Sequence, residues 1–165
     1  ARNRRLCVNG GSDIHGFDGS NPLGTPYEIG TPTTVVWAES LSRRAIVDSL
    51  RSCRAYITQH PSGPSLIIKS GELMMGDVIT ASLTDLVTID VEVKQAMAGA
   101  VLLVFHNGAP VHVSVLNGEA QTVQINVPAI AQGGVRAELR PPITPPSYPT
   151  PLALTNPIFI RAPSD

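Results

Sequence analysis

The sequence predicts an α/β segment over residues 1–62 followed by an all-β, antiparallel sandwich over residues 63–165. Two observations favour this division. Clear helical periodicity is found only before residue 64, whereas short alternating segments separated by turn residues fill the rest of the chain. Prolines and glycines also cluster at residues 61–64, as in a linker. We therefore expect two domains that meet between residues 62 and 63.

The first part of the chain indicates strand, loop, strand, helix and strand. Ser42 is a suitable N-cap for a helix that ends near Cys53, because apolar residues follow it at helical spacing. A glycine- and proline-rich stretch is too broken for regular structure. We expect strands at residues 1–8, 33–38 and 55–58, and a loop at residues 16–34.

The second part has the pattern of an immunoglobulin-like sandwich, in which short strands recur with regular turn signals. The pairs Asn107-Gly108 and Asn117-Gly118 favour tight hairpins, since type I′ turns need positive φ at both central residues. We expect strands at residues 65–70, 78–83, 87–93, 100–106, 111–116, 120–127, 133–140 and 156–161.

Composition excludes several classes of partner. Twelve basic and thirteen acidic residues give a net charge of −1, so no overall field attracts nucleic acid or an anionic membrane. No stretch reaches the roughly twenty apolar residues of a bilayer span, and no signal-peptide pattern is present. The basic cluster of Arg2, Arg4 and Arg5 is expected to be solvated.

The two cysteines lie outside any zinc-ligand spacing. Cys7 and Cys53 are 46 positions apart and neither belongs to a Cys-x-x-Cys pair. Free cysteine behaves as a small buried hydrophobe. We therefore expect both as buried thiols rather than as a disulfide.

A carboxylate and an imidazole stand two residues apart where the first apolar run gives way to glycine. In Gly-Gly-Ser-Asp-Ile-His-Gly, at residues 10–16, Asp13 and His15 can reach neighbouring divalent cations. Such ions lower the pKa of bound water and supply hydroxide near neutral pH. The alternative is structural, because Asp also caps turns and His also bonds backbone carbonyls.

Other polar residues are weaker candidates. Asp18, Tyr27 and Glu28 in the long loop could contact a substrate, or could be ordinary loop residues. His60 stands before Pro61 at the expected boundary. His106 and His112 flank a predicted turn and are expected at strand ends, facing solvent.

Several segments resemble the polymerase-and-histidinol-phosphatase (PHP) superfamily, in its CehA/McbA-like branch of carbaryl-hydrolase-type metallohydrolases. The likeness touches both ends of the chain and leaves the middle without motif identity. The segments that resemble this branch are residues 10–16, 23–27, 30–36, 41–46, 49–58 and 154–160.

The resemblance implies that residues 1–62 are the carboxyl-terminal piece of a PHP-type (β/α)7 barrel. Such a barrel holds two or three divalent ions, zinc or manganese with iron as a third candidate. The family's late Asp-x-His maps onto Asp13 and His15, and a metal-bound hydroxide would attack an ester, carbamate, amide or phosphoester of a small-molecule substrate. The earlier ligands have no counterpart here. Because catalytic zinc takes three protein ligands, we expect the chain to be inactive without the remainder of the barrel.

Three functions therefore stay open. The first is part of a metal-dependent hydrolase, completed within one polypeptide. The second is a non-catalytic module in which residues 65–165 bind a polymer or another subunit, although 4% aromatic content is low for a carbohydrate platform. The third is a two-chain enzyme or homo-oligomer, in which exposed strands pair with another chain.

Overall fold

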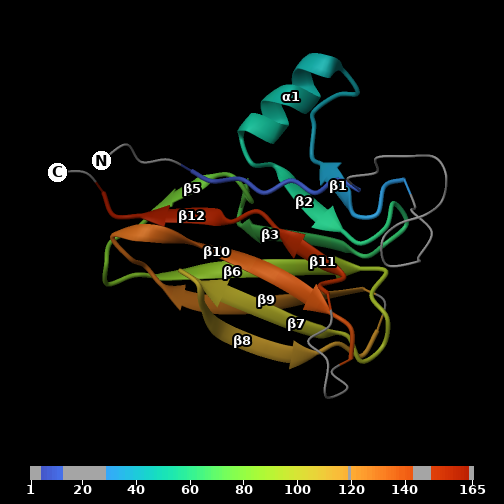
Figure 1. Cartoon of the computed structure of the whole chain (residues 1–165). Coiled ribbons are helices and arrows are strands. Elements are labelled where there is room, and N and C mark those ends of the chain that lie inside the picture. Colours follow the sequence, from blue (N-terminus) through green and yellow to red (C-terminus); the bar gives the residue numbers. More distant parts are fainter. Residues whose placement is uncertain (1–4, 13–28, 119, 143–149, 164–165) are drawn as a thin grey trace.

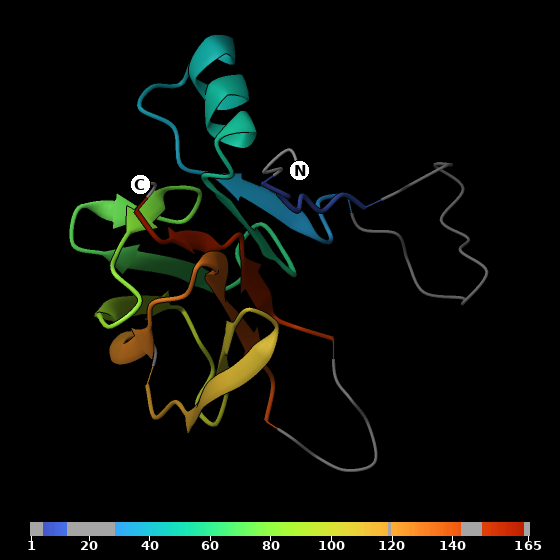
Figure 2. The same cartoon turned by 90° about the vertical axis from the view of Figure 1, so that its left-hand side faces the viewer.

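The computed structural model describes residues 5–12, 29–118, 120–142 and 150–163. Within them, two β-sheets pack against each other and one helix, α1 (Arg43–Arg51), projects beside the larger sheet (Figure 1, Figure 2). The strands are β1 (Thr33–Val36), β2 (Ala55–Thr58), β3 (Ser65–Ser70), β4 (Leu73–Met74), β5 (Val78–Thr80), β6 (Leu86–Lys94), β7 (Val101–His106), β8 (Ala109–Val115), β9 (Ala120–Pro128), β10 (Gln132–Arg140), β11 (Ala153–Thr155) and β12 (Ile158–Arg161).

The larger sheet is built around β10. One side of β10 pairs with β7, which pairs in turn with β8. The other side pairs with β12 near the start of β10 and with β11 near its end. From there β11 continues to β2 and β1, and β12 continues to β5. The sheet thus divides into two branches between β11 and β12, at Asn156 and Pro157.

The core lies between this sheet and the smaller one, whose order is β4-β3-β6-β9. In β6, for example, alternate residues point inward, as the two-residue period of a strand requires. The largest fully buried side chains are aliphatic or methionine, and they come from both sheets: Leu66, Ile68, Met75, Ile89, Leu102, Leu116, Leu139, Ile158, Ile160, Val91, Val93 and Val104.

The expected barrel piece is wrong. The strands of a (β/α)7 barrel are parallel and alternate with helices, whereas β1 pairs with β2 antiparallel, and β2 pairs antiparallel with β11 from the far end of the chain. The large sheet also continues across the expected boundary between residues 62 and 63. Two packed sheets are compatible with the β-sandwich expected for the second part.

The helix prediction is confirmed. Ser42 caps α1 by accepting a hydrogen bond from the Ala45 amide at 3.2 Å. The helix ends at a tight turn in which Cys53 has a φ of 59°. Only Ser49 of α1 is buried, so the helix contributes little to the core.

The two predicted Asn-Gly hairpins have different outcomes. Asn107-Gly108 joins β7 to β8 with φ of 51° and 87°, as a type I′ turn requires. At Asn117-Gly118 no hairpin forms, because β8 pairs with β7 in one sheet and β9 pairs with β6 in the other. The second pair instead marks a crossing between sheets, which local turn chemistry does not distinguish.

The expected strand at residues 1–8 is not formed in its described part, residues 5–8. Residues 5–10 lie along the outer face of the large sheet, held by side chains (Figure 1). Asn156, fully buried, accepts from the Val8 amide at 2.7 Å and donates to the Val8 carbonyl at 3.0 Å. Thr34 Oγ1 accepts from the Gly10 amide and donates to the Gly10 carbonyl, both at 2.8 Å. Side-chain groups thus replace a neighbouring strand.

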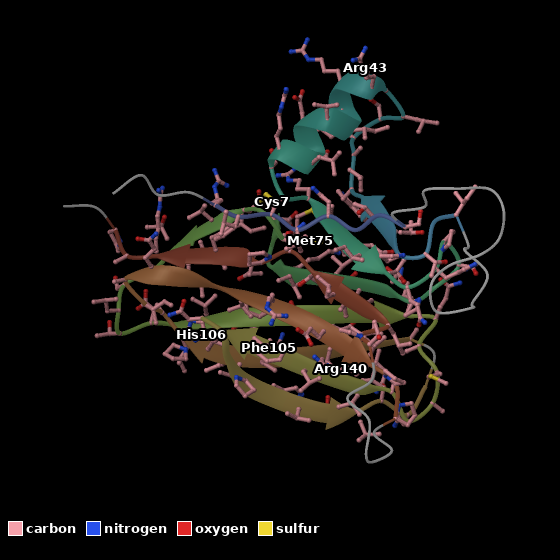
Figure 3. All side chains as sticks on the ribbon, viewed as in Figure 1. Cys7, Arg43, Met75, Phe105, His106 and Arg140 are labelled. Atoms are coloured by element: carbon pink, nitrogen blue, oxygen red, sulfur yellow. A yellow bond between two sulfur atoms is a disulfide. The ribbon has the colours of Figure 1, made fainter. Side chains whose placement is uncertain are left out.

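A disulfide joins Cys7 to Cys53, with their Cα atoms 5.2 Å apart. The expectation of two free thiols is therefore wrong. Figure 3 shows Cys7 at the foot of α1. Because Cys53 follows the helix directly, the disulfide fastens the amino-terminal segment to the turn between α1 and β2.

The disulfide decides whether residues 5–10 stay in place. Among the described residues they make five side-chain hydrogen bonds with the rest of the chain, and each contributes about 0.5–1.5 kcal/mol. Ordering the backbone of these six residues costs about 1–2 kcal/mol each, which is more than the five hydrogen bonds return. Leu6 is 78% exposed and Val8 45% exposed, so burial adds little.

We expect Asn156→Ala to lower the free energy of unfolding by about 2–4 kcal/mol, because the Ala55 carbonyl and both Val8 backbone groups lose a partner. Asn156→Asp should lower the free energy of unfolding by a similar amount, since a carboxylate cannot donate a hydrogen bond to the Val8 and Ala55 carbonyls. Urea unfolding measures both. Asn126→Ala, on the exposed part of β9, is the control and should cost less than about 0.5 kcal/mol. Equal effects at both positions would contradict this role of Asn156.

Candidate functional site

Most of the residues predicted to form a site lie outside the described part of the chain. These residues are Asp13, His15, Asp18, Tyr27 and Glu28. His60 is described and exposed, in the turn after β2. Its Nδ1 lies 2.8 Å from Ser62 Oγ and accepts from the Ser62 amide at 3.2 Å. These two hydrogen bonds stabilise the turn after β2, and a site role for His60 stays a prediction.

The described residues contain no group of three or more His, Cys, Asp and Glu side chains that could hold a metal ion. The two cysteines are joined in the disulfide and cannot act as thiolate ligands. The metal pair Asp13 and His15 lies outside the described residues and therefore stays a prediction.

The described surface has a cleft of about 530 Å³ on the outer face of the large sheet. It lies where the start of β10, β12 and the β7–β8 turn meet. We call it the arginine cleft. It is lined by Arg5, Leu6, Val78, Phe105, Asn107, Gly108, Gln132, Gly133, Gly134, Arg136, Pro157, Phe159, Ile160 and Arg161.

Strand register explains the shape of the arginine cleft. Gly134 lies opposite Phe159 on β12, and Arg136 lies opposite Phe105 on β7. Residues two apart on a strand share a face, so Gly134 and Arg136 line the cleft together. Because Gly134 has no side chain, Pro157 and Phe159 can lie close to its backbone. The amide of Asn107 donates to the Gly134 carbonyl at 2.9 Å and brings the β7–β8 turn to the rim.

Two arginines of the cleft lie over aromatic rings. The Arg136 Cζ lies 4.3 Å from the centre of the Phe105 ring, and the Arg5 Cζ lies 5.9 Å from that of Phe159. Arg5 also donates to the Gly76 carbonyl at 2.9 Å. Arg5 is exposed, as expected, and the amino-terminal segment also places it on the wall of the cleft.

Glu138, which lies two residues after Arg136 on β10, orients the Arg136 side chain. It forms ion pairs with both Arg136 and Arg140, and its side chain is almost fully buried. Burial raises the pKa of Glu138, but hydrogen bonds and charge from the two arginines outweigh it, so the pKa is lowered. Glu138 is thus ionised near neutral pH and fixes one side of Arg136.

The positive charge of the cleft is only partly compensated by the described residues, through the Arg136–Glu138 ion pair. None of its lining residues is acidic, and Arg161 has no carboxylate partner among the described residues. None of the lining residues has a nucleophilic or general-base side chain either. The arrangement of the described residues can bind and orient an anion with an apolar part.

The sequence alone does not indicate that the residues of the cleft lie together. Arg5, Arg136 and Arg161 are far apart along the chain and no motif joins them. A partial signal exists in β10, where Arg136, Glu138 and Arg140 alternate with buried Val135, Ala137 and Leu139. This alternation predicts charged residues on one face of the strand. It does not predict which other strands supply the remaining residues of the cleft.

His106 differs from the expected solvent-facing position. It follows Leu102 and Val104 on the inner face of β7 and is 7% exposed, with Nε2 lacking a hydrogen-bond partner among the described residues. Figure 3 shows it beside Phe105 at the end of the strand. Burial lowers the pKa of His106. His112 is half-buried, with Nε2 3.0 Å from Ser114 Oγ.

No protein-family model matches the chain, and no curated protein and no solved structure shows similarity to it. The PHP resemblance of residues 10–16 therefore stays a prediction, without the barrel that it implied. Among the described residues, no helix has the length and apolar character needed to cross a membrane.

We expect the Glu138 carboxylate to contribute stability above its unfolded pKa of about 4.3, and this contribution to be lost as the pH falls through its lowered folded pKa. Glu138→Gln should therefore be clearly less stable than the wild type at pH 7, with the difference shrinking in acid. Urea unfolding between pH 7 and pH 3 measures it. Exposed Glu72→Gln is the control. A difference that does not change with pH would contradict the ion-pair role.

His106 should act in a separate pH window. Because its folded pKa is lowered, protonation favours unfolding, and stability falls as the pH drops below the unfolded value of about 6.5. His106→Gln should flatten the unfolding free energy between pH 7 and pH 5. His60→Gln, at an exposed turn, should leave that slope in place.

Proposed function

We propose that this chain is a non-catalytic β-sandwich binding module that recognises an anionic ligand with an aromatic or other planar apolar part. The observation that supports this function most is the arginine cleft. Three guanidinium groups from different parts of the chain, Arg5, Arg136 and Arg161, line it with two phenylalanine rings and without a carboxylate.

The arrangement suits binding because its cations are positioned before a ligand arrives. Arg136 is fixed between Glu138 and the Phe105 ring, and Arg5 lies between Gly76 and the Phe159 ring. A guanidinium group binds carboxylate, sulfate or phosphate oxygens through two parallel N–H donors. Pre-positioned groups lose less conformational entropy on binding, which favours affinity.

Catalysis has less support. A metal-dependent hydrolase needs further ligands beside Asp13 and His15, and the barrel that would gather them is not formed. The cleft itself has no side chain that can attack a bond or transfer a proton at neutral pH. We therefore propose the binding module over the hydrolase.

We expect phenyl phosphate to bind the arginine cleft with a Kd in about the millimolar range, as a small ligand of this size allows. Titration followed by ¹H–¹⁵N NMR should shift the amide signals of Gly108, Gly133 and Gly134 in a saturable way. Phenol, which lacks the charge, should bind more weakly. Added salt should weaken the binding of phenyl phosphate, because it screens the attraction between the phosphate and the arginines.

Arg161→Gln should weaken phenyl phosphate binding by about tenfold, because a hydrogen bond to a charged group is removed. The matched control is Arg43→Gln on α1, which is exposed and is not among the residues of the cleft (Figure 3). Equal affinity of the two variants, or shifts spread evenly over the chain, would overturn the proposal.

A further inference from the structure

One wall of the arginine cleft depends on a covalent bond outside it. Arg5 and Leu6 line the cleft, and Cys7 follows directly, bonded to Cys53. Arg5 itself has few attachments, namely one hydrogen bond to the Gly76 carbonyl and the approach of its guanidinium group to the Phe159 ring. The position of the third cation is therefore set by the residues that follow it.

The other attachments of residues 5–10 are weak. Val8 and Gly10 are held through Asn156 and Thr34, and the side chains of Leu6 and Val8 are largely exposed. For this segment the entropy cost of ordering the backbone exceeds what its hydrogen bonds contribute. The strand ladders of both sheets involve none of these residues, so the segment can leave the sheet without loss of a strand pair.

We infer that the disulfide Cys7–Cys53 is a redox switch for the arginine cleft. In the oxidised chain, residues 5–10 lie against the sheet and Arg5 contributes the third cation. In the reduced chain the segment leaves, the cleft loses Arg5, and the Phe159 ring is uncovered. This inference rests on the proposed function for its effect on ligand affinity, whereas release of the segment is independent of it.

The reaction needs a dithiol as reductant. One thiolate of the dithiol attacks Sγ of Cys7, which is half-buried, whereas Cys53 is buried. The Sγ–Sγ bond breaks, a mixed disulfide forms, and Cys53 leaves as a thiolate and takes up a proton. The second thiol of the dithiol then displaces Cys7. Two electrons and two protons pass to the cysteines, and the dithiol becomes a cyclic disulfide. Since protein disulfides persist in oxidising compartments, the cleft is complete there and incomplete in a reducing one.

Hydrogen exchange followed by NMR tests the release of the segment. The full chain is compared before and after treatment with dithiothreitol. The amides of Val8 and Gly10, which donate to Asn156 and Thr34, should exchange at least tenfold faster after reduction. The core amides of Val104 and Leu139 should exchange at an unchanged rate. Unchanged exchange at Val8 and Gly10 would overturn the switch.

Phenyl phosphate titration tests the effect on the cleft. Reduction should raise its Kd by about tenfold, and Arg5→Gln in the oxidised chain should do the same while Val8 stays protected. The double variant Cys7→Ser, Cys53→Ser should match the reduced chain, also without any reductant. Release of the segment with unchanged Kd would overturn the role of Arg5. Failure of the oxidised wild type to bind would instead overturn the proposed function, and hydrogen exchange would still decide whether the segment is released.

Discussion

The buried side chain of Asn156 determines how the two ends of the chain meet. Asn156 lies where the large sheet divides between β11 and β12. Its side-chain amide forms hydrogen bonds with the Val8 backbone on one side and with the Ala55 carbonyl on the other. A β-strand paired at this point would extend only one of the two branches of the sheet. A single amide, with both donor and acceptor atoms, instead satisfies three backbone groups of two segments at one point. While residues 5–10 lie against the sheet Asn156 is fully buried, so water does not compete for these bonds.

The arginine cleft follows from this divided sheet. β12 pairs with the start of β10, and Phe159 comes to lie opposite Gly134, whose lack of a side chain lets the Phe159 ring lie close to the backbone. Val8, held by Asn156, directs the amino-terminal segment toward the same place, and the disulfide at Cys7 fixes it there. Arg5 therefore meets Arg136 and Arg161 through backbone geometry and one covalent bond. Repulsion among the three cations is offset in part by Glu138 and by the two rings.

The candidate site was largely unpredictable from the sequence for a related reason. The pair Asp13 and His15 is conspicuous because its members are two residues apart, whereas the three arginines are brought together only by strand pairing. His106 could have been placed correctly, because the alternation of Leu102, Val104 and His106 puts it on the inner face of β7. The turn signal at Asn107-Gly108 instead favours a solvent-facing strand end, and the alternation outweighs it in the fold. For the cysteines, spacing excluded a zinc site but carried no information on their distance in the fold.

The sequence by itself determined the local structure: α1 with its Ser42 cap, the Asn107-Gly108 hairpin, and alternating strands over much of residues 65–161. These features depend on residues close together in the chain, where periodicity and turn chemistry act. Only the tertiary structure decided that β2 pairs with β11, that Cys7 bonds Cys53, and that Asn117-Gly118 crosses between sheets. Those outcomes depend on which distant surfaces pack together, and burial of the shared core selects among pairings that are equally acceptable locally.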